Sequence, residues 1–157
     1  PFIRPLGSAS YSTCFDPKGR LWIGSVGRGW TTGDPMIEVI SCDESKPPFE
    51  MHRIELKPDG FDVHFTLPLE EATVPADQIS IRQFHYLYWA EYGSDRQDVV
   101  KLPVNRVTLS ADRRKLSIRV PVARNNIYEI DLGALRSADG IELQNNFAFY
   151  TLNELVQ

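Results

Sequence analysis

The residues best suited to chemistry lie in one stretch, residues 79–92, which reads Ile-Ser-Ile-Arg-Gln-Phe-His-Tyr-Leu-Tyr-Trp-Ala-Glu-Tyr. Aromatic rings at alternate positions can stack on the apolar faces of pyranose rings, and a charged side chain at the edge can bind hydroxyl groups. The stretch therefore predicts a surface for sugar stacking. Its predicted members are Phe84, Tyr86, Tyr88, Trp89 and Tyr92, with Arg82 or Glu91 as the polar contact and Trp30 from the N-terminal part.

The same stretch is predicted to form one long β-strand with two apolar faces, because successive strand residues point to opposite sides of a sheet. Such a strand either lies in a sheet that is covered on both sides, or presents its aromatic face to a partner. In the first case the rings fill a core or dock on the N-terminal hairpin, and the face is an interdomain interface. Exposed rings favour sugar binding, and buried rings favour the interface. One face would carry Ile79, Ile81, Leu87 and Trp89, and the other Phe84, Tyr86, Tyr88 and Tyr92.

The other reactive side chains show no arrangement that predicts catalysis. His52, His64 and His85 fall on separate predicted strands without a metal-ligand spacing. Glu70 and Glu71 lie in an acidic loop, and nothing converges on them as a paired acid and base. The sequence lacks a Cys-x-x-Cys motif, which argues against a zinc ribbon or a covalent haem. We therefore expect no catalytic residue, no metal and no cofactor in this chain, and no enzymatic activity of its own.

The two cysteines, Cys14 and Cys42, are the whole thiol content of the sequence. Both fall in strand-like segments of the N-terminal part, so a disulfide between them is geometrically possible if those strands pair. Two buried free thiols fit the sequence equally well. The sequence leaves this pairing open.

The composition is that of an ordinary globular protein, with 42% hydrophobic and 24% charged residues. A length of 157 residues is sufficient for one full core and a small second unit. The net charge of −4 argues against nucleic acid as a partner, because phosphate binding needs clustered Lys and Arg. No apolar run reaches the roughly 18 residues of a membrane helix, so no membrane insertion is expected. A first residue of Pro1 rather than Met is typical of a processed or excised piece of a longer protein.

Turn signals and alternating apolar residues divide the chain into three parts. Residues 1–43 read as a β-hairpin segment, with strands at 11–15 and 20–25 around an Asp-Pro-Lys-Gly turn and a further strand at 36–42. Residues 44–50 contain a Pro-Pro pair and read as a linker. Residues 51–157 hold about seven strands at intervals of roughly 8–12 residues, the pattern of an immunoglobulin-like β-sandwich. The predicted class is therefore all-β. The strands of the sandwich are expected at 51–56, 61–67, 79–92, 104–109, 115–120, 127–132 and 146–152.

The residues Gly19-Arg20-Leu21-Trp22-Ile23-Gly24-Ser25, followed by Arg28-Gly29-Trp30, carry a family resemblance. This segment resembles the end of the last propeller blade in secreted bacterial proteins related to quinone-dependent glucose/sorbosone dehydrogenases. The remainder is similar to the region after that propeller in large multidomain members, often ahead of a cytochrome c module. The quinone site of the family would lie on earlier blades and the cytochrome after this chain, so no catalytic residue is carried over. The motifs are Asp59-Gly60-Phe61, Tyr86-x-Tyr88, Tyr92-Gly93-Ser94, Lys101-Leu102-Pro103-Val104, Leu109-Ser110-Ala111-Asp112, Tyr128-Glu129-Ile130 and Tyr150-Thr151-Leu152-Asn153.

The resemblance implies a noncatalytic accessory or scaffold domain of a secreted carbohydrate-oxidising multidomain protein, with a propeller-derived segment at residues 1–43. Its partners would be other domains of that larger protein. The alternative is a carbohydrate-binding module, whose partner would be a polysaccharide held on the aromatic face. The resemblance places the protein outside the cell or in the periplasm, which a disulfide would also suit.

Overall fold

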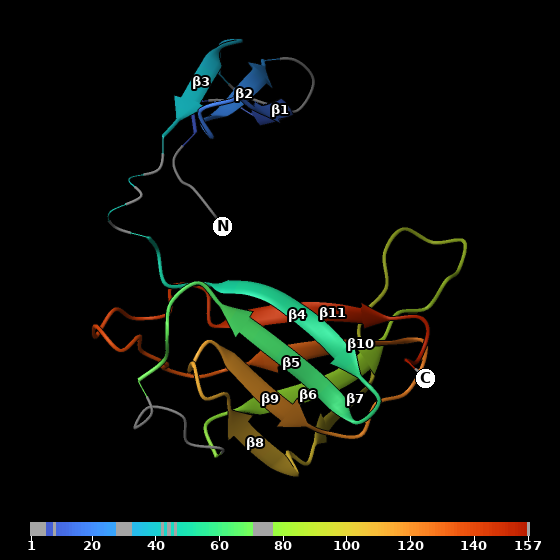
Figure 1. Cartoon of the computed structure of the whole chain (residues 1–157). Helices are drawn as coiled ribbons and strands as arrows, with labels where there is room; N and C mark the ends of the chain where they lie inside the picture. Colours follow the sequence, from blue (N-terminus) through green and yellow to red (C-terminus); the bar gives the residue numbers. More distant parts are fainter. Residues whose placement is uncertain are drawn as a thin grey trace. The chain divides into compact units, whose positions relative to one another are not determined.

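The computed structural model describes residues 6–7, 9–27, 33–41, 43, 45, 47–70 and 77–156 (Figure 1). In this part of the chain all regular elements are β-strands, arranged in three antiparallel sheets, which confirms the predicted all-β class. The chain divides into two compact units, Pro1–Pro47 and Pro48–Gln157. The boundary between them falls inside the linker predicted at residues 44–50.

The first unit contains a three-stranded sheet in the order β1-β2-β3, formed by β1 (Ala9–Phe15), β2 (Leu21–Val26) and β3 (Ile37–Ile40). The turn between β1 and β2 is organised by Asp16. Its carboxylate accepts hydrogen bonds from the backbone N–H groups of Lys18 and Arg20 and from the indole N–H of Trp22. The hydrogen bond from Trp22 and those from Arg20 and Lys18 outweigh burial and hold the pKa of Asp16 well below its usual range. Gly19 supplies the positive φ of 74° that the turn needs.

This first sheet has little core of its own. Of its described hydrophobic side chains only Ile23 is fully buried, while Tyr11, Phe15 and Ile37 are exposed. An isolated sheet of three short strands is at best marginally stable in water unless it packs on a neighbour.

The second unit is a β-sandwich of two four-stranded sheets (Figure 1). One sheet has the order β4-β5-β9-β8 and the other the order β11-β10-β6-β7. In chain order, the first sheet holds the first, second, fifth and sixth strands of the unit, and the second sheet holds the third, fourth, seventh and eighth. This order agrees with the immunoglobulin-like arrangement expected from the sequence, with one additional strand beside the third. The strands are β4 (Met51–Lys57), β5 (Gly60–Phe65), β6 (Ser80–His85), β7 (Gln97–Leu102), β8 (Arg106–Leu109), β9 (Lys115–Arg119), β10 (Asn126–Asp131) and β11 (Phe147–Leu152).

The core forms between the sheets from alternate residues of each strand. On β5 and β9 the inward residues are fully or almost fully buried, and the residues between them carry charge or hydroxyl groups. Burial of this apolar area is the main favourable term in folding the sandwich. The buried set includes Phe49, Phe61, Val63, Phe65, Leu69, Ile79, Ile81, Leu116, Ile118, Tyr128, Ile130, Leu132 and Leu152.

Tyr128 ties β10 to the loop that precedes it. Its hydroxyl oxygen lies 2.7 Å from the backbone nitrogen of Ala123, from which it accepts a hydrogen bond, and 3.0 Å from the Gln83 Oε1 atom of β6. The ring itself packs in the core against Phe61. A tyrosine on the penultimate strand that bonds back to the backbone just upstream is a recurrent feature of immunoglobulin-like sandwiches.

The strand predicted at residues 79–92 is wrong in its second half, because β6 ends at His85. Beyond that point the chain turns back on itself. The indole nitrogen of Trp89 donates to the carbonyl oxygen of Gly93 at 2.6 Å, and the backbone N–H of Leu87 donates to the Ser94 hydroxyl at 3.0 Å. Gly93 has a φ of 82°, which suits a turn. These local hydrogen bonds replace the inter-strand hydrogen bonds that a longer β6 would need. We call residues 86–96 the aromatic loop.

Strand β7 (Gln97–Leu102) is the second difference, because the sequence predicts no strand between residues 92 and 104. It pairs with β6 through a bulge, in which Gln83 lies opposite Val100 and His85 lies opposite Gln97. Asp98 has a positive φ of 48° within this bulge. Strand β7 is an edge strand with an exposed surface, so it tolerates polar residues. Because residues 93–98 are polar, the pattern of apolar residues does not predict a strand here.

Candidate functional site

The aromatic loop protrudes from one end of the sandwich between β6 and β7 and is yellow-green in Figure 1. Tyr88 and Tyr92 are fully exposed at its surface, and Trp89 is 52% exposed. The loop encloses an open hollow of about 520 Å³, lined by Tyr86, Leu87, Tyr88, Trp89, Glu91, Gly93 and Ser94. Most of the predicted stacking residues therefore lie on one exposed loop rather than on the face of a strand.

Phe84 does not belong to that exposed group. It is only 1% exposed, because the guanidinium of Arg96 lies 4.5 Å above its ring and the rings of Tyr86 and Phe149 pack against it edge-on. A covered ring cannot stack on a ligand, so the prediction for Phe84 is corrected: it supports the base of the loop. Tyr86, at 48% exposure, lies between this base and the exposed part.

Arg82 belongs to an ion cluster at the same base. Glu129 of β10 has a side chain that is only 10% exposed, and it binds Arg82 across the β6–β10 pair and Arg96 from the end of the loop. The Arg96 Nη1 atom lies 2.6 Å from the Glu129 Oε2 atom. The hydrogen bond that Arg96 donates to Glu129 raises the pKa of Arg96, and this arginine therefore stays charged. Arg82 is thus engaged by a carboxylate, and its free edge is the part left for a ligand.

Sequence reasoning missed Glu129, Arg96 and Phe149 as parts of this site. Their strands or loops are distant in sequence and meet only when β6, β10 and β11 pair side by side. The one local signal is that Glu129 interrupts the apolar run of β10 at an outward position, where a charged residue needs a partner across the sheet. We call the outward surface of this sheet, with Phe84, Glu129, Phe147, Phe149 and the covering Arg82 and Arg96, the aromatic face.

Two predicted residues, Trp30 and Cys42, lie outside the described residues. Trp30 therefore stays a prediction as a stacking residue. Cys14 is an exposed residue of β1, and its pairing with Cys42 also stays a prediction.

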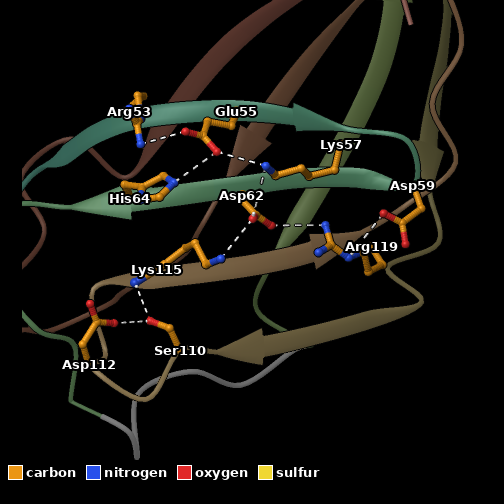
Figure 2. Close-up of polar contacts among 10 residues, drawn as sticks. All are labelled: Arg53, Glu55, Lys57, Asp59, Asp62, His64, Ser110, Asp112, Lys115 and Arg119. Carbon is orange, nitrogen blue, oxygen red and sulfur yellow. Dashed lines mark hydrogen bonds and ion pairs between the residues drawn. The ribbon is translucent and has the colours of Figure 1, made fainter. Parts of the chain in front are cut away.

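The other sheet carries a different surface, shown in Figure 2, which we call the charged face. Asp62 of β5 lies at its centre with a side chain that is 5% exposed. Its carboxylate oxygens lie 3.2 Å from the Lys115 Nζ atom, 3.2 Å from the Arg119 Nη1 atom and 3.9 Å from the Lys57 Nζ atom. Burial acts to raise the pKa of Asp62, but hydrogen bonds from Ser117 and Lys115 and the nearby cations outweigh it and lower that pKa.

Glu55 forms a second centre on the charged face, directly opposite Asp62 across the β4–β5 pair. Two carboxylates in this position repel each other unless cations intervene. Lys57 reaches both of them, and Arg53 and His64 also lie against Glu55, at 2.7 and 3.5 Å. The hydrogen bond from Lys57 lowers the pKa of Glu55. The acids and bases of this face are therefore engaged mainly with one another.

The three histidines are not brought together. His52 and His64 lie on β4 and β5, and His85 lies at the end of β6, 3.8 Å from the Asp98 carboxylate. Within the described ranges no group of three or more His, Cys, Asp or Glu side chains could hold a metal ion.

The sandwich fold is similar to parts of three solved structures of a bacterial S-layer protein, SbsC. They are a crystal structure of rSbsC(31-844), a crystal structure of the N-terminal part, and a structure of domains 1–6. Each match covers 72% of this chain at 20% identity, with TM-scores of 0.54, 0.54 and 0.53. The chain spans 15%, 25% and 15% of the length of those structures. At this identity the likeness shows a shared fold.

No family model matches the sequence, and no curated protein matches it. In the part of the chain that the structure describes, no helix has the length and apolarity to cross a membrane.

Proposed function

We propose that this chain is a noncatalytic accessory region of a secreted multidomain protein, with the sandwich acting as a scaffold domain beside other domains. Following the sequence resemblance, the parent is a carbohydrate-oxidising protein. The likeness to SbsC supports the placement of such a fold in a long extracellular protein, because this chain spans no more than 25% of the matched chains.

The observation that carries the proposal is the surface of the first unit. Its three-stranded sheet leaves Ile37 and Val39 exposed on one face and Phe15 exposed on the other, and fully buries only Ile23 among its described hydrophobic residues. Large exposed apolar side chains on a sheet that is marginal by itself mark a surface that another protein region covers. Further domains of the same parent are the simplest source of that cover.

The test is the intact mass of the natural polypeptide, measured in its source before any step that could cleave it. A mass well above 17.9 kDa is expected. A mass equal to that of this chain would overturn the proposal.

The noncatalytic role is tested by deleting residues 48–157 from the parent protein. Oxidation of sugar with a soluble electron acceptor should persist in the deletion variant. Loss of this activity in a deletion variant that remains folded would contradict the noncatalytic role.

A second candidate function is carbohydrate binding by the aromatic loop, and the exposure of Tyr88, Trp89 and Tyr92 favours it. The hydrogen bonds that Trp89 and Leu87 form within the loop give it a defined conformation in which to present these rings. Titration calorimetry with soluble oligosaccharides would measure this binding. Tyr88→Ala should abolish it, whereas Tyr11→Ala, which removes an exposed tyrosine from the first unit, should leave it unchanged.

A further inference from the structure

An open hollow of about 720 Å³ lies at one end of the charged face, beside the turn between β4 and β5. Its volume is in the range of small-molecule sites. Two arginines, an asparagine and a threonine supply hydrogen-bond donors to its wall, and two prolines and two valines supply apolar surface. The lining includes Asn105, Arg106, Thr108, Arg119, Pro121 and Val122.

Arg106 and Arg119 form the unusual feature of this hollow. They lie directly opposite each other in the β8–β9 pair, so both side chains are on the same side of the sheet. Like charges in this position repel and destabilise a sheet. The acidic pair Glu55 and Asp62, in the equivalent position on β4 and β5, has Lys57 between its members. Within the described part of the chain Arg106 forms no ion pair, so no carboxylate bridges the two arginines in the way that Lys57 bridges the two acids.

Arg119 is only partly neutralised by its acidic neighbours. Its Nε atom lies 3.4 Å from Asp59, whose side chain is 69% exposed, and its Nη1 atom lies 3.2 Å from Asp62. Asp62 also forms ion pairs with Lys57 and Lys115. The buried Nη1 atom has no hydrogen-bond partner of good geometry among the described residues. Lys57, Lys115 and Arg119 thus share Asp62, with Glu55 also beside Lys57 and Asp59 also beside Arg119, whereas Arg106 has no carboxylate partner among the described residues.

We propose that this hollow binds an oxyanion, the carboxylate or sulfate group of a hydroxyl-bearing ligand such as an acidic sugar. Paired guanidinium groups suit a planar carboxylate or a sulfate because each can donate two parallel N–H bonds. The Asn105 amide and the Thr108 hydroxyl are available for hydroxyl groups of the ligand, and Pro121 and Val122 offer an apolar wall for a sugar ring. The bound anion would also relieve the repulsion between the two arginines. This inference holds whether or not the parent oxidises sugars.

The experiment titrates the full chain with glucuronate, inorganic sulfate and neutral glucose, and follows the backbone amides of β8 and β9 by NMR together with the melting temperature. Glucuronate and sulfate should shift the amides around Thr108 and Ser117 and raise the melting temperature. Glucose should do neither. Tighter binding of glucuronate than of sulfate identifies an acidic saccharide as the ligand, and equal affinity identifies a free oxyanion; both support the site.

Two variants give the control. Arg106→Gln should weaken anion binding by at least about tenfold, since it removes one charged fork from the site. Arg124→Gln makes the same charge change at an exposed position outside the hollow and should leave the affinity as it is. Because Arg106 has no ion pair within the described residues, its replacement should not unfold the sandwich. Absence of binding by both anions, or equal weakening by the two variants, would overturn the proposal.

Discussion

The charged face and the aromatic face lie on opposite outer sides of the same sandwich and follow the same strand alternation. On the charged face, long cationic side chains cover Asp62 and Glu55, and the pairs run from strand to strand. On the aromatic face, one carboxylate, Glu129, holds two arginines, and exposed phenylalanines surround it. Strand geometry decides which residues point outward, whereas the side chains decide whether an outward surface is satisfied internally or left open to a partner.

This difference separates stability from binding in the two faces. The centre of the charged face holds the Asp62 carboxylate through several contacts, so this centre, unlike the hollow beside Arg106, is expected to matter mainly for folding. The aromatic face is anchored at its base by Glu129 and Phe84, while its loop exposes Tyr88 and Tyr92. Substitutions that test this separation should cost the most stability at Asp62 and at the buried Phe84, less at Glu129, and almost none at the exposed tyrosines.

Among the substitutions of charged residues, Asp62→Ala should have the largest effect. The substitution leaves Lys57, Lys115 and Arg119 clustered without their shared carboxylate, and breaking a buried ion pair costs about 3 kcal/mol or more. Because these cations are themselves partly exposed, we expect the lower end of that range, about 3 kcal/mol. Chemical denaturation of the full chain measures it. Asp59→Ala is the matched control, with an expected cost of about 0.5 kcal/mol or less for its exposed pair; equal losses in the two variants would contradict the central role of Asp62.

Glu129→Ala should have the next largest effect, about 2 kcal/mol, because hydrogen bonds to charged groups contribute roughly 1.5–3 kcal/mol. It should also free Arg96 from the base of the aromatic loop. Hydrogen exchange within residues 86–96 should accelerate in the variant. Glu154→Ala removes an exposed carboxylate that pairs with Arg124 at 3.4 Å and serves as the control. An unchanged exchange rate in the loop after Glu129→Ala would show that the ion pairs of Glu129 do not hold the loop in place.

The sequence predicts most of the sandwich because alternation is a local signal. The predicted strands at 51–56, 115–120 and 127–132 lie within one or two residues of β4, β9 and β10. The strand prediction extends too far along the aromatic stretch because Tyr and Trp favour strands. The hydrogen bonds that close the loop run from Trp89 to Gly93 and from Leu87 to Ser94. Each involves a side chain, and the alternation of apolar residues does not predict such partners.

The two clusters on the outer faces could be predicted only in part. Asp62 and Glu129 stand at outward positions of apolar strands, which predicts that each needs a partner. The identity of the partners depends on register: Arg82 meets Glu129 because of the β6–β10 pairing, and Arg106 meets Arg119 because of the β8–β9 pairing. Register follows from the packing of the whole core and not from any one strand.

The pH dependence of the unfolding free energy gives a further test of the charged face, with a smaller expected effect than the two alanine substitutions. The pKa of Asp62 is lowered from its ordinary value of 3.8, so its folded form is stabilised when ionised. This contribution is fully present above pH 3.8 and is lost as the pH falls through the lower folded pKa. The difference in unfolding free energy between the wild type and Asp62→Asn should therefore shrink as the pH is lowered below 3.8. A difference that stays constant down to the acid transition would show that the charge of Asp62 does not contribute.

The smallest effect on stability is expected at the exposed tyrosines of the aromatic loop. Tyr88 and Tyr92 are fully exposed, so Tyr88→Ala and Tyr92→Ala lose almost no buried area and should change the unfolding free energy by about 0.5 kcal/mol or less. Phe84→Ala, four and eight residues away in sequence but buried under Arg96, should cost about 3 kcal/mol. If the tyrosine variants instead lose as much stability as Phe84→Ala, their rings pack on another part of the protein in solution. In that case the aromatic loop is an internal interface, and the surface that we assign to sugar binding is already occupied.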